Sequence, residues 1–196
     1  MQILCATQNP GKHKEFQQIL GDESINLVFP EDFPEVADFD PEETGQSFQE
    51  NSLIKARAFA EATGVITLAD DSGLEVTSLD GQPGILSKRF ALGSDHDRNQ
   101  RVLTLLEDKK DRSARFVSVL CLYDPSLKEH RFFEGVVTGT IAPQEQGTAG
   151  FGYDPIFIPD GYEQTFGELG TEIKNTISHR RRAIVKLHTY LLEQTQ

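Results

Sequence analysis

Cysteine is scarce in this sequence, which holds two, Cys5 and Cys121, among 196 residues. Both lie in apolar, strand-like runs, a setting typical of buried reduced thiols, although a reactive role is the alternative. Two such residues provide no disulfide framework, and this fits a reducing compartment. We therefore expect the protein to be cytoplasmic.

Long apolar runs and an excess of positive charge are also lacking. No apolar run reaches the ~20 residues that cross a bilayer, and the apolar stretch at residues 1–6 is too short for a signal peptide, so no membrane partner is expected. The formal net charge is −12, whereas proteins that coat nucleic acid usually carry a basic stripe. Polymeric DNA or RNA is thus not an expected partner. A small polyanion such as a nucleotide would need a local basic site and a divalent cation.

The remaining composition predicts a globular protein with a real core, since 37% of residues are hydrophobic and 13 are Phe. Helical and strand periodicities intermix, and no linker separates two halves, so we expect one α/β domain over residues 1–196 with a mixed sheet. The last two predicted strands form a hairpin. The predicted strands are 2–6, 27–29, 65–69, 74–79, 116–123 and 132–141. The predicted helices are 12–20 with a stop at Gly21, 47–62 with a stop at Gly64, 95–107 with Val102, Leu105 and Leu106 inward, 165–169, and a last one capped by Ser178.

The first polar loop has the features of a phosphate cradle. It connects a strand to a helix, whose first N–H groups have no partner within the helix and favour an anion. The alternative is an ordinary helix start with Asn9 as its N-cap. The loop consists of Thr7, Gln8, Asn9, Pro10, Gly11 and Lys12.

Two adjacent carboxylates, Asp70 and Asp71, are predicted to lie in an acidic turn that ends a buried strand. Neighbouring carboxylates repel each other unless something compensates, and Mg²⁺ is a suitable partner because it binds one or two carboxylates and completes its shell with water and phosphate oxygens. The alternative is a solvated acidic turn. Glu43 lies in a second acidic loop that could reach the same metal, or could simply be solvated.

Lys55 lies four residues after Asn51 on the predicted helix that leads into this strand, so the two share a face. Lys55 could offset phosphate charge, or it could face solvent. The glycine-flanked segment Phe151, Gly152, Tyr153 and Asp154 could stack on a base and accept a hydrogen bond from it, or could be a turn with core aromatics.

Cationic residues near a capped helix start form the last candidate group. A positive charge there opposes the helix dipole and is unfavourable for stability, so it indicates a site that binds an anion or a keto oxygen. The residues are Lys174, His179 and Arg180, followed by Arg181 and Arg182. Successive helical residues point about 100° apart, so only some of these arginines can face one site.

Together and in order, these segments resemble the inosine triphosphate pyrophosphatase family, the non-standard purine nucleoside triphosphate pyrophosphatases. The shared motifs are T-x-N-x-G-K from Thr7, E-N-x-x-x-K-A from Glu50, A-D-D-S-G-L from Ala69, G-x-P-G-x-x-S-x-R-F from Gly81, G-F-G-Y-D-P from Gly150 and S-H-R from Ser178. Lys88 departs from the family pattern.

The resemblance implies an elongated α/β fold with a mixed central sheet flanked by helices, a cleft between two lobes, and a homodimer. It implies Mg²⁺-dependent hydrolysis of ITP, dITP or XTP to the monophosphate and pyrophosphate, which cleanses the nucleotide pool. Asp71 would be the base and a metal ligand, with Glu43 as a further ligand, Asp70 nearby and Lys55 assisting. Residues 7–12 would bind the triphosphate. The nucleotide would also contact Ser72, Phe151, Gly152, Tyr153, Asp154, Lys174, His179 and Arg180.

Two other functions remain open at this point. A phosphatase would release orthophosphate, although Asp70 and Asp71 lack the D-x-D spacing of enzymes that form an aspartyl phosphate. A nucleotide-binding regulator would bind without turnover.

Overall fold

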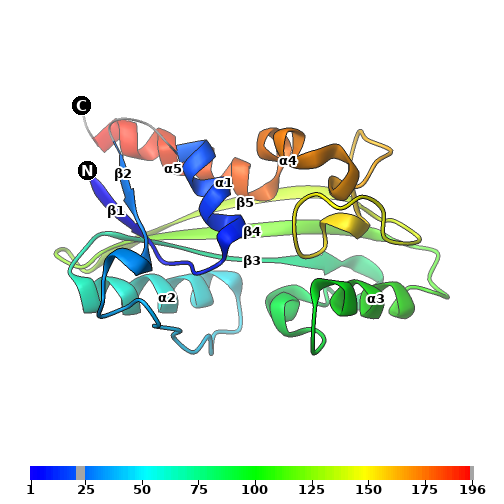
Figure 1. Ribbon diagram of the computed structural model, residues 1–196, viewed down its shortest axis with the longest axis horizontal. Coiled ribbons are helices and arrows are strands. Elements are labelled where there is room, and N and C mark those ends of the chain that lie inside the picture. Colours follow the sequence, from blue (N-terminus) through cyan, green and yellow to red (C-terminus); the bar gives the residue numbers. More distant parts are fainter. Residues whose placement is uncertain (21–24, 195–196) are drawn as a thin grey trace. The chain divides into compact units, whose positions relative to one another are not determined.

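The structure is a computed structural model that describes residues 1–20 and 25–194 (Figure 1). The helix stop predicted at Gly21 lies outside these residues. In chain order the elements are β1 (Gln2–Cys5), α1 (Pro10–Leu20), β2 (Asn26–Val28), η1 (Pro30–Asp32), α2 (Phe48–Thr63), β3 (Thr67–Val76), η2 (Thr77–Leu79), η3 (Gly84–Arg89), α3 (Asp95–Leu105), β4 (Ser113–Asp124), β5 (Glu129–Ile141), η4 (Asp154–Ile156), β6 (Phe157–Pro159), α4 (Phe166–Ile177) and α5 (His179–Gln194).

The strands form one mixed sheet in the order β2-β1-β3-β4-β5-β6. β1 runs parallel to β2 and β3, with Leu4 opposite Thr67 and Cys5 opposite Leu68, whereas β6 runs antiparallel to β5. The short turn between β4 and β5 makes the predicted hairpin. A mixed sheet flanked by helices confirms the predicted fold class. β6 had no counterpart in the sequence prediction.

The acidic segment 70–73 is not a turn, and that prediction was wrong. Residues 67–76 form one continuous strand, β3, in place of the two predicted strands, and Asp70 and Asp71 lie in its middle. Asp, Ser and Gly favour turns when only local sequence is considered. Here β3 is a central strand between β1 and β4, and the pairing and burial that this position gives outweigh the local preference.

The observed helix ends agree with the sequence prediction at α2 and differ from it at α4. Ser47 accepts a hydrogen bond from the Glu50 N–H and Gly64 ends α2 in the left-handed region, both as predicted. The predicted helix 165–169 is too short, because α4 continues to Ile177 across non-helical backbone at Gly170. Leu105 was expected to face inward, but it is 40% exposed, while Val102 and Leu106 on the same segment are fully buried.

The chain divides into two compact units, which we describe separately. The first unit contains residues 1–71, 118–134 and 182–196, and the second contains 72–117 and 135–181. β3, β4 and β5 contribute residues to both units. The expectations of a single domain and of a cleft between two lobes stay predictions.

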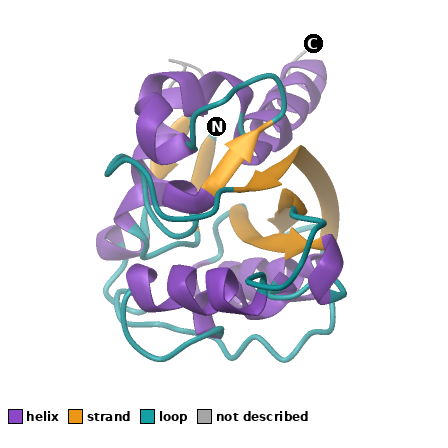
Figure 2. Cartoon of the chain, turned by 90° about the vertical axis from the view of Figure 1, so that its right-hand side faces the viewer, coloured by secondary structure: helices purple, strands orange, loops and turns teal. Residues whose placement is uncertain are grey.

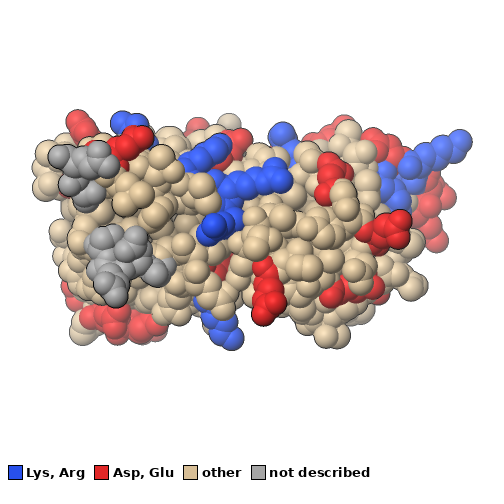
Figure 3. Space-filling view, turned by 90° about the horizontal axis from the view of Figure 1, so that it is seen from above, with Lys and Arg blue, Asp and Glu red and all other residues tan. Residues whose placement is uncertain are grey.

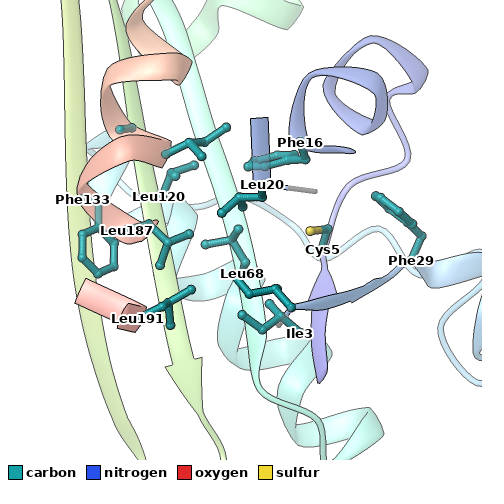
Figure 4. Packing of buried hydrophobic residues seen from close by; sticks show 13 residues of the cluster. Ile3, Cys5, Phe16, Leu20, Phe29, Leu68, Leu120, Phe133, Leu187 and Leu191 are labelled. Carbon is teal, nitrogen blue, oxygen red and sulfur yellow. The ribbon is translucent and has the colours of Figure 1, made fainter. Parts of the chain in front are cut away.

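In the first unit, helices cover both faces of the strands. One core cluster joins Phe16 of α1 and Leu187 of α5 to Cys5 of β1 (Figure 4). The other cluster joins Phe59 of α2 to Leu4, the neighbour of Cys5 on the same strand. Because successive strand residues point to opposite faces, α1 and α5 cover one face of this part of the sheet and α2 covers the other.

The second unit has one core cluster, in which Val102 of α3 and Phe166 of α4 contribute alongside residues of β3, β4 and β5. Its centre is aromatic: Phe116 lies 4.6 Å from Phe157 between ring centroids, and Phe157 lies 5.5 Å from Phe166. Figure 2 shows helices on both sides of the strands.

Both cysteines are buried free thiols, as predicted, and burial raises the pKa of Cys5 and of Cys121 to about 12. Among the described residues, no helix is long and apolar enough to cross a membrane.

The packing of α5 predicts unequal effects of two leucine substitutions. Leu187 is fully buried, so Leu187→Ala is expected to lower the free energy of unfolding by about 2–5 kcal/mol, measured by urea denaturation. Leu192 on the same helix is 45% exposed, so Leu192→Ala should change it by less than about 0.5 kcal/mol. Equal losses from the two variants would contradict this packing.

Candidate functional site

The predicted phosphate loop is also a well-capped helix start. The side-chain oxygen of Asn9 accepts hydrogen bonds from the Gly11 N–H at 2.8 Å and the Lys12 N–H at 3.3 Å, so Asn9 is the N-cap of α1. Thr7 accepts from the Asn9 N–H at 3.2 Å, and the Gln8 amide donates to the carbonyl of Ala37. Because two first-turn N–H groups already have a partner, the Lys12 side chain is the main group here that can meet an anion.

Asp70 is a fully buried carboxylate that holds Lys12. The Lys12 ammonium lies 2.8 Å from one carboxylate oxygen of Asp70, and the Ser118 hydroxyl donates to the other at 2.7 Å. Leu68 and Leu120, two residues away on each strand, belong to the cluster covered by α1 and α5, so Asp70 and Ser118 face α1. Sequence reasoning missed Ser118, because a lone hydroxyl in an apolar strand gives no signal until β3 and β4 are paired.

Asp71 points to the opposite face, toward α2, and its setting differs. It is 7% exposed, and among the described residues its Oδ2 atom has no hydrogen-bond partner. Burial raises the pKa of Asp71 to about 6; Lys55 and Lys12 oppose that rise, while Glu43 and Asp70 add to it. A carboxyl group with this pKa exchanges its proton near neutral pH, as a general base must.

Lys55 connects the loop that carries Glu43 to the strand that carries Asp70. Its ammonium forms an ion pair with Glu43 and lies 3.4 Å from the backbone carbonyl of Asp70. The structure thus brings Lys12, Lys55, Glu43, Asp70 and Asp71 into one cluster. The cations lie on α1 and α2, and the acidic pair lies on the strand between those helices.

The loop that carries Glu43 is fastened to the start of α2. The Gly45 N–H donates to the Asn51 side chain at 2.8 Å, and the Gln46 N–H donates to Glu50 at 2.6 Å. Ser47 and Glu50 have the spacing of a capping box in the sequence, but among the described residues Glu50 accepts from the Gln46 N–H and not from the Ser47 N–H. A side chain at Gly45 would place its Cβ 2.7 Å from the Asn51 oxygen, so the close approach requires glycine.

In the second unit, the glycine-flanked loop surrounds a buried ion pair. Asp154 accepts from the Lys174 ammonium at 2.7 Å and from the Phe151 N–H at 2.8 Å, and both charged side chains are buried. The Lys174 ammonium lies 4.3 Å from the centre of the Phe151 ring, and the guanidinium of Arg180 lies 5.9 Å from it. Gly150 has φ 79°, and a Cβ there would lie 2.0 Å from the Asp154 carboxylate.

Arg180 is the arginine of its run that faces inward. It is 2% exposed and donates to the Ser72 hydroxyl at 2.9 Å, whereas Arg182 is exposed. His179 stacks on Phe116 with ring centroids 4.7 Å apart. The second unit therefore gathers Ser72, Phe151, Asp154, Lys174 and Arg180 through direct contacts. Lys and Arg side chains also gather into a patch on the face shown in Figure 3, despite the net negative charge.

Tyr153 lies in the core, although the sequence placed it among the nucleotide contacts. It is 4% exposed, its hydroxyl donates to the carbonyl of Ser87 at 2.8 Å, and burial raises the pKa of its phenol. Its neighbour Gly152 instead contacts Asp95 and Asn99 of α3, which sequence reasoning did not single out.

Comparison with known proteins identifies the family. The model of the Ham1 family matches residues 3–190. The chain belongs to the Ham1 family. A protein of Aquifex aeolicus named dITP/XTP pyrophosphatase is 41% identical over 198 residues, which cover 95% of each chain. Among solved structures, the Ham1 protein of Staphylococcus aureus is 39% identical with a TM-score of 0.89 and covers 99% of this chain and 100% of its own. A HAM1 protein of Coxiella burnetii is 41% identical with a TM-score of 0.91 and covers 98% and 99%.

In this Ham1 protein the acidic cluster could bind a divalent cation, but it would supply only some of the cation's ligands. The buried Oδ2 atom of Asp71 has no hydrogen-bond partner among the described residues, and a cation would satisfy it. No group of three or more His, Cys, Asp or Glu residues in the described part of the chain could hold a metal ion. A cation at Asp71 would therefore take most of its ligands from water or from substrate oxygens, as Mg²⁺ commonly does.

The raised pKa of Asp71 predicts a linkage between protons and metal in the Ham1 protein. Without metal, the Asp71 carboxyl should titrate at about pH 6, measured by carbon NMR. A cation binds the ionised form, so saturating Mg²⁺ should move this midpoint downward, and metal affinity should rise as pH increases through about 6.

Asp97 provides the internal control, because hydrogen bonds from Ser94 lower the pKa of this exposed carboxyl and no metal role is assigned to it. Its midpoint should not respond to Mg²⁺. A midpoint for Asp71 that stays at its metal-free value under saturating Mg²⁺ would exclude Asp71 as a ligand.

Proposed function

We propose that this Ham1 protein is a Mg²⁺-dependent pyrophosphatase that converts dITP, ITP and XTP to the monophosphate and pyrophosphate. The observation that carries the proposal is Asp71, a buried carboxyl group with one unsatisfied oxygen and a pKa raised to about 6, beside Lys12 and Lys55. The name dITP/XTP pyrophosphatase, borne by a relative that matches over nearly the full length, supports the substrate class.

The phosphate groups would bind to the cations of the first unit. Lys12 is paired with Asp70, and an ammonium has three protons, so it can keep this ion pair and still donate to a phosphate oxygen. Lys55, paired with Glu43, can do the same. Asp71 and Glu43 would hold Mg²⁺, which when bound would offset phosphate charge and acidify water.

Hydrolysis then needs a base and a stabilised leaving group. Asp71 accepts a proton from water as the water oxygen bonds to the α-phosphorus, and the bond from that phosphorus to the bridging oxygen breaks. Pyrophosphate leaves with the electron pair of the broken bond, and the ammonium groups of Lys12 and Lys55 stabilise its charge. Asp70 takes no proton in this scheme, because both of its oxygens are bonded to Lys12 and Ser118.

The base would be read by the second unit. The ring of Phe151 can stack on a purine, an interaction that contributes about 1–3 kcal/mol. Arg180 is a donor, and hypoxanthine and xanthine present a 6-keto acceptor where adenine presents a 6-amino donor. A mismatched adenine would leave a buried donor unpaired, at a cost of about 1–3 kcal/mol. His179 completes the proposed contacts.

The remaining expectations are part of the same proposal. A cytoplasmic homodimer without polymeric nucleic acid as a partner fits an enzyme that cleanses the nucleotide pool. The chain's net charge of −12 favours small substrates that arrive with a divalent cation.

The products distinguish the proposed reaction from simple phosphate removal. With Mg²⁺ present, ITP and XTP should each yield pyrophosphate and monophosphate, and ATP should react much more slowly, measured by separate assays for pyrophosphate and orthophosphate. The rate with GTP tests whether the 2-amino group of guanine is excluded, because guanine shares the 6-keto group of hypoxanthine. Orthophosphate with nucleoside diphosphate as the products would overturn the proposal in favour of a phosphatase.

Substitution at Asp71 tests the base. Asp71→Asn removes the proton acceptor, so kcat should fall by about 10²–10⁴-fold, whereas nucleotide binding should stay measurable by calorimetry. The matched control is Asp108→Asn, which changes an exposed carboxylate and should leave both quantities unchanged. Near-normal turnover in Asp71→Asn would show that another group is the base.

A further inference from the structure

Gly152 is held by both of its backbone groups. Its N–H donates to the Asp95 carboxylate at 2.6 Å, and its carbonyl accepts from the Asn99 amide at 3.2 Å. Asp95 and Asn99 are four residues apart on α3, so they share one face of that helix. With the N–H and the carbonyl both bonded, the peptide planes on either side of Gly152 are fixed. Its φ of 64° is one that few side chains tolerate.

Asn99 is costly for the fold, which points to a role other than stability. It is 1% exposed, and its Oδ1 atom is buried with no hydrogen-bond partner in the part of the chain that the structure describes. An unsatisfied buried acceptor destabilises a protein, and an apolar side chain of similar size would avoid that cost. What Asn99 supplies is its amide nitrogen, which donates both to Gly152 and, at 2.7 Å, to Glu145.

Glu145 in turn fixes the orientation of that amide. Its second carboxylate oxygen accepts from His96 at 2.6 Å and from Gln100 at 3.2 Å. Burial raises the pKa of Glu145, but the hydrogen bonds from Asn99, His96 and Gln100 outweigh this effect and bring the pKa below its ordinary value. A charged Glu145 accepts more strongly than a neutral one, so Asn99 is held with its nitrogen toward Glu145 and Gly152.

We propose that Asp95 and Asn99 are positioning residues that set purine selectivity by clamping Gly152. Gly152 directly follows Phe151, whose ring lies against Lys174 and Arg180 and whose N–H bonds to Asp154. The clamp on one side and Asp154 on the other hold the backbone of Phe151 at two points. This fixes the angle at which the ring meets a base, and hence whether a 6-keto oxygen reaches the donors. The inference rests on the proposed function for its substrate class.

Selectivity is the decisive kinetic measurement. In Asn99→Leu and Asp95→Ala, the ratio of kcat/KM for ITP to that for ATP should fall about 5–30-fold, the range expected when one recognition hydrogen bond is misaligned. Asp95→Asn keeps an acceptor for the Gly152 N–H and should retain most of the ratio. Gln100→Ala is the matched control, because among the described residues Gln100 bonds to Glu145 and makes no hydrogen bond to Gly152, and it should leave the ratio within about twofold.

Hydrogen exchange of the Gly152 amide, measured by NMR in the ligand-free protein, tests the clamp independently of activity. The amide should exchange slowly in the wild type and about tenfold or more faster in Asp95→Ala. Rapid exchange in the wild type would overturn the clamp. Slow exchange combined with an unchanged ITP/ATP ratio in both variants would overturn the selectivity role, since a merely structural residue lowers both activities together. If the wild type releases no pyrophosphate from any nucleotide, the proposed function is wrong and the selectivity role is wrong with it. The hydrogen-exchange rate of the Gly152 amide still tests the clamp in that case.

Discussion

The candidate site depends on one constraint, which is that a central strand must bury two adjacent carboxylates. Successive residues of β3 point to opposite faces, so Asp70 and Asp71 are separated and each meets a different helix. Asp70 turns toward α1 and is satisfied by Lys12 and Ser118. Asp71 turns toward α2 and keeps one oxygen without a hydrogen-bond partner among the described residues. The alternation of a strand thus gives two identical groups different settings, one carboxylate bonded through both oxygens and one with an unsatisfied oxygen.

Burial of charge has a different purpose in the second unit. The Lys174–Asp154 pair is almost wholly buried, and such pairs often stabilise a fold less than apolar residues of the same volume would. Their value lies in orientation. Asp154 holds the Lys174 ammonium against the Phe151 ring and also bonds the Phe151 backbone, so one carboxylate aligns both a cation and an aromatic face. That arrangement is suited to recognition more than to stability.

Local signals in the sequence were enough for much of the fold but not for its centre. Ser47, Gly64 and Ser178 mark helix ends through chemistry that acts within a few residues, and the structure agrees with them. The continuity of β3 is not a local property, because the pairing with β1 and β4 that stabilises it comes from distant segments. Asp70 and Asp71 could therefore be chosen as candidate residues while their secondary structure was predicted wrongly.

The same distinction holds within the site. The residue types of the cluster around Lys12, Lys55 and Asp71 were predictable, since phosphate and metal chemistry demands cations and carboxylates. Pairings such as Lys12 with Asp70 join residues 58 positions apart and follow only from the packing of α1 against β3. Ser118 and Asn99 gave no signal, because a hydroxyl in a strand or an amide in a helix acquires its role from the neighbour that the fold supplies.

The burial of both cysteines has a practical consequence. A thiol reacts through its thiolate, and a pKa of about 12 leaves Cys5 and Cys121 almost entirely protonated at neutral pH, deep in the first unit. Alkylating reagents should therefore not modify these two thiols in the folded protein. Leu92 is 97% exposed, so a single cysteine introduced there can carry a spectroscopic label while the two natural thiols stay in place.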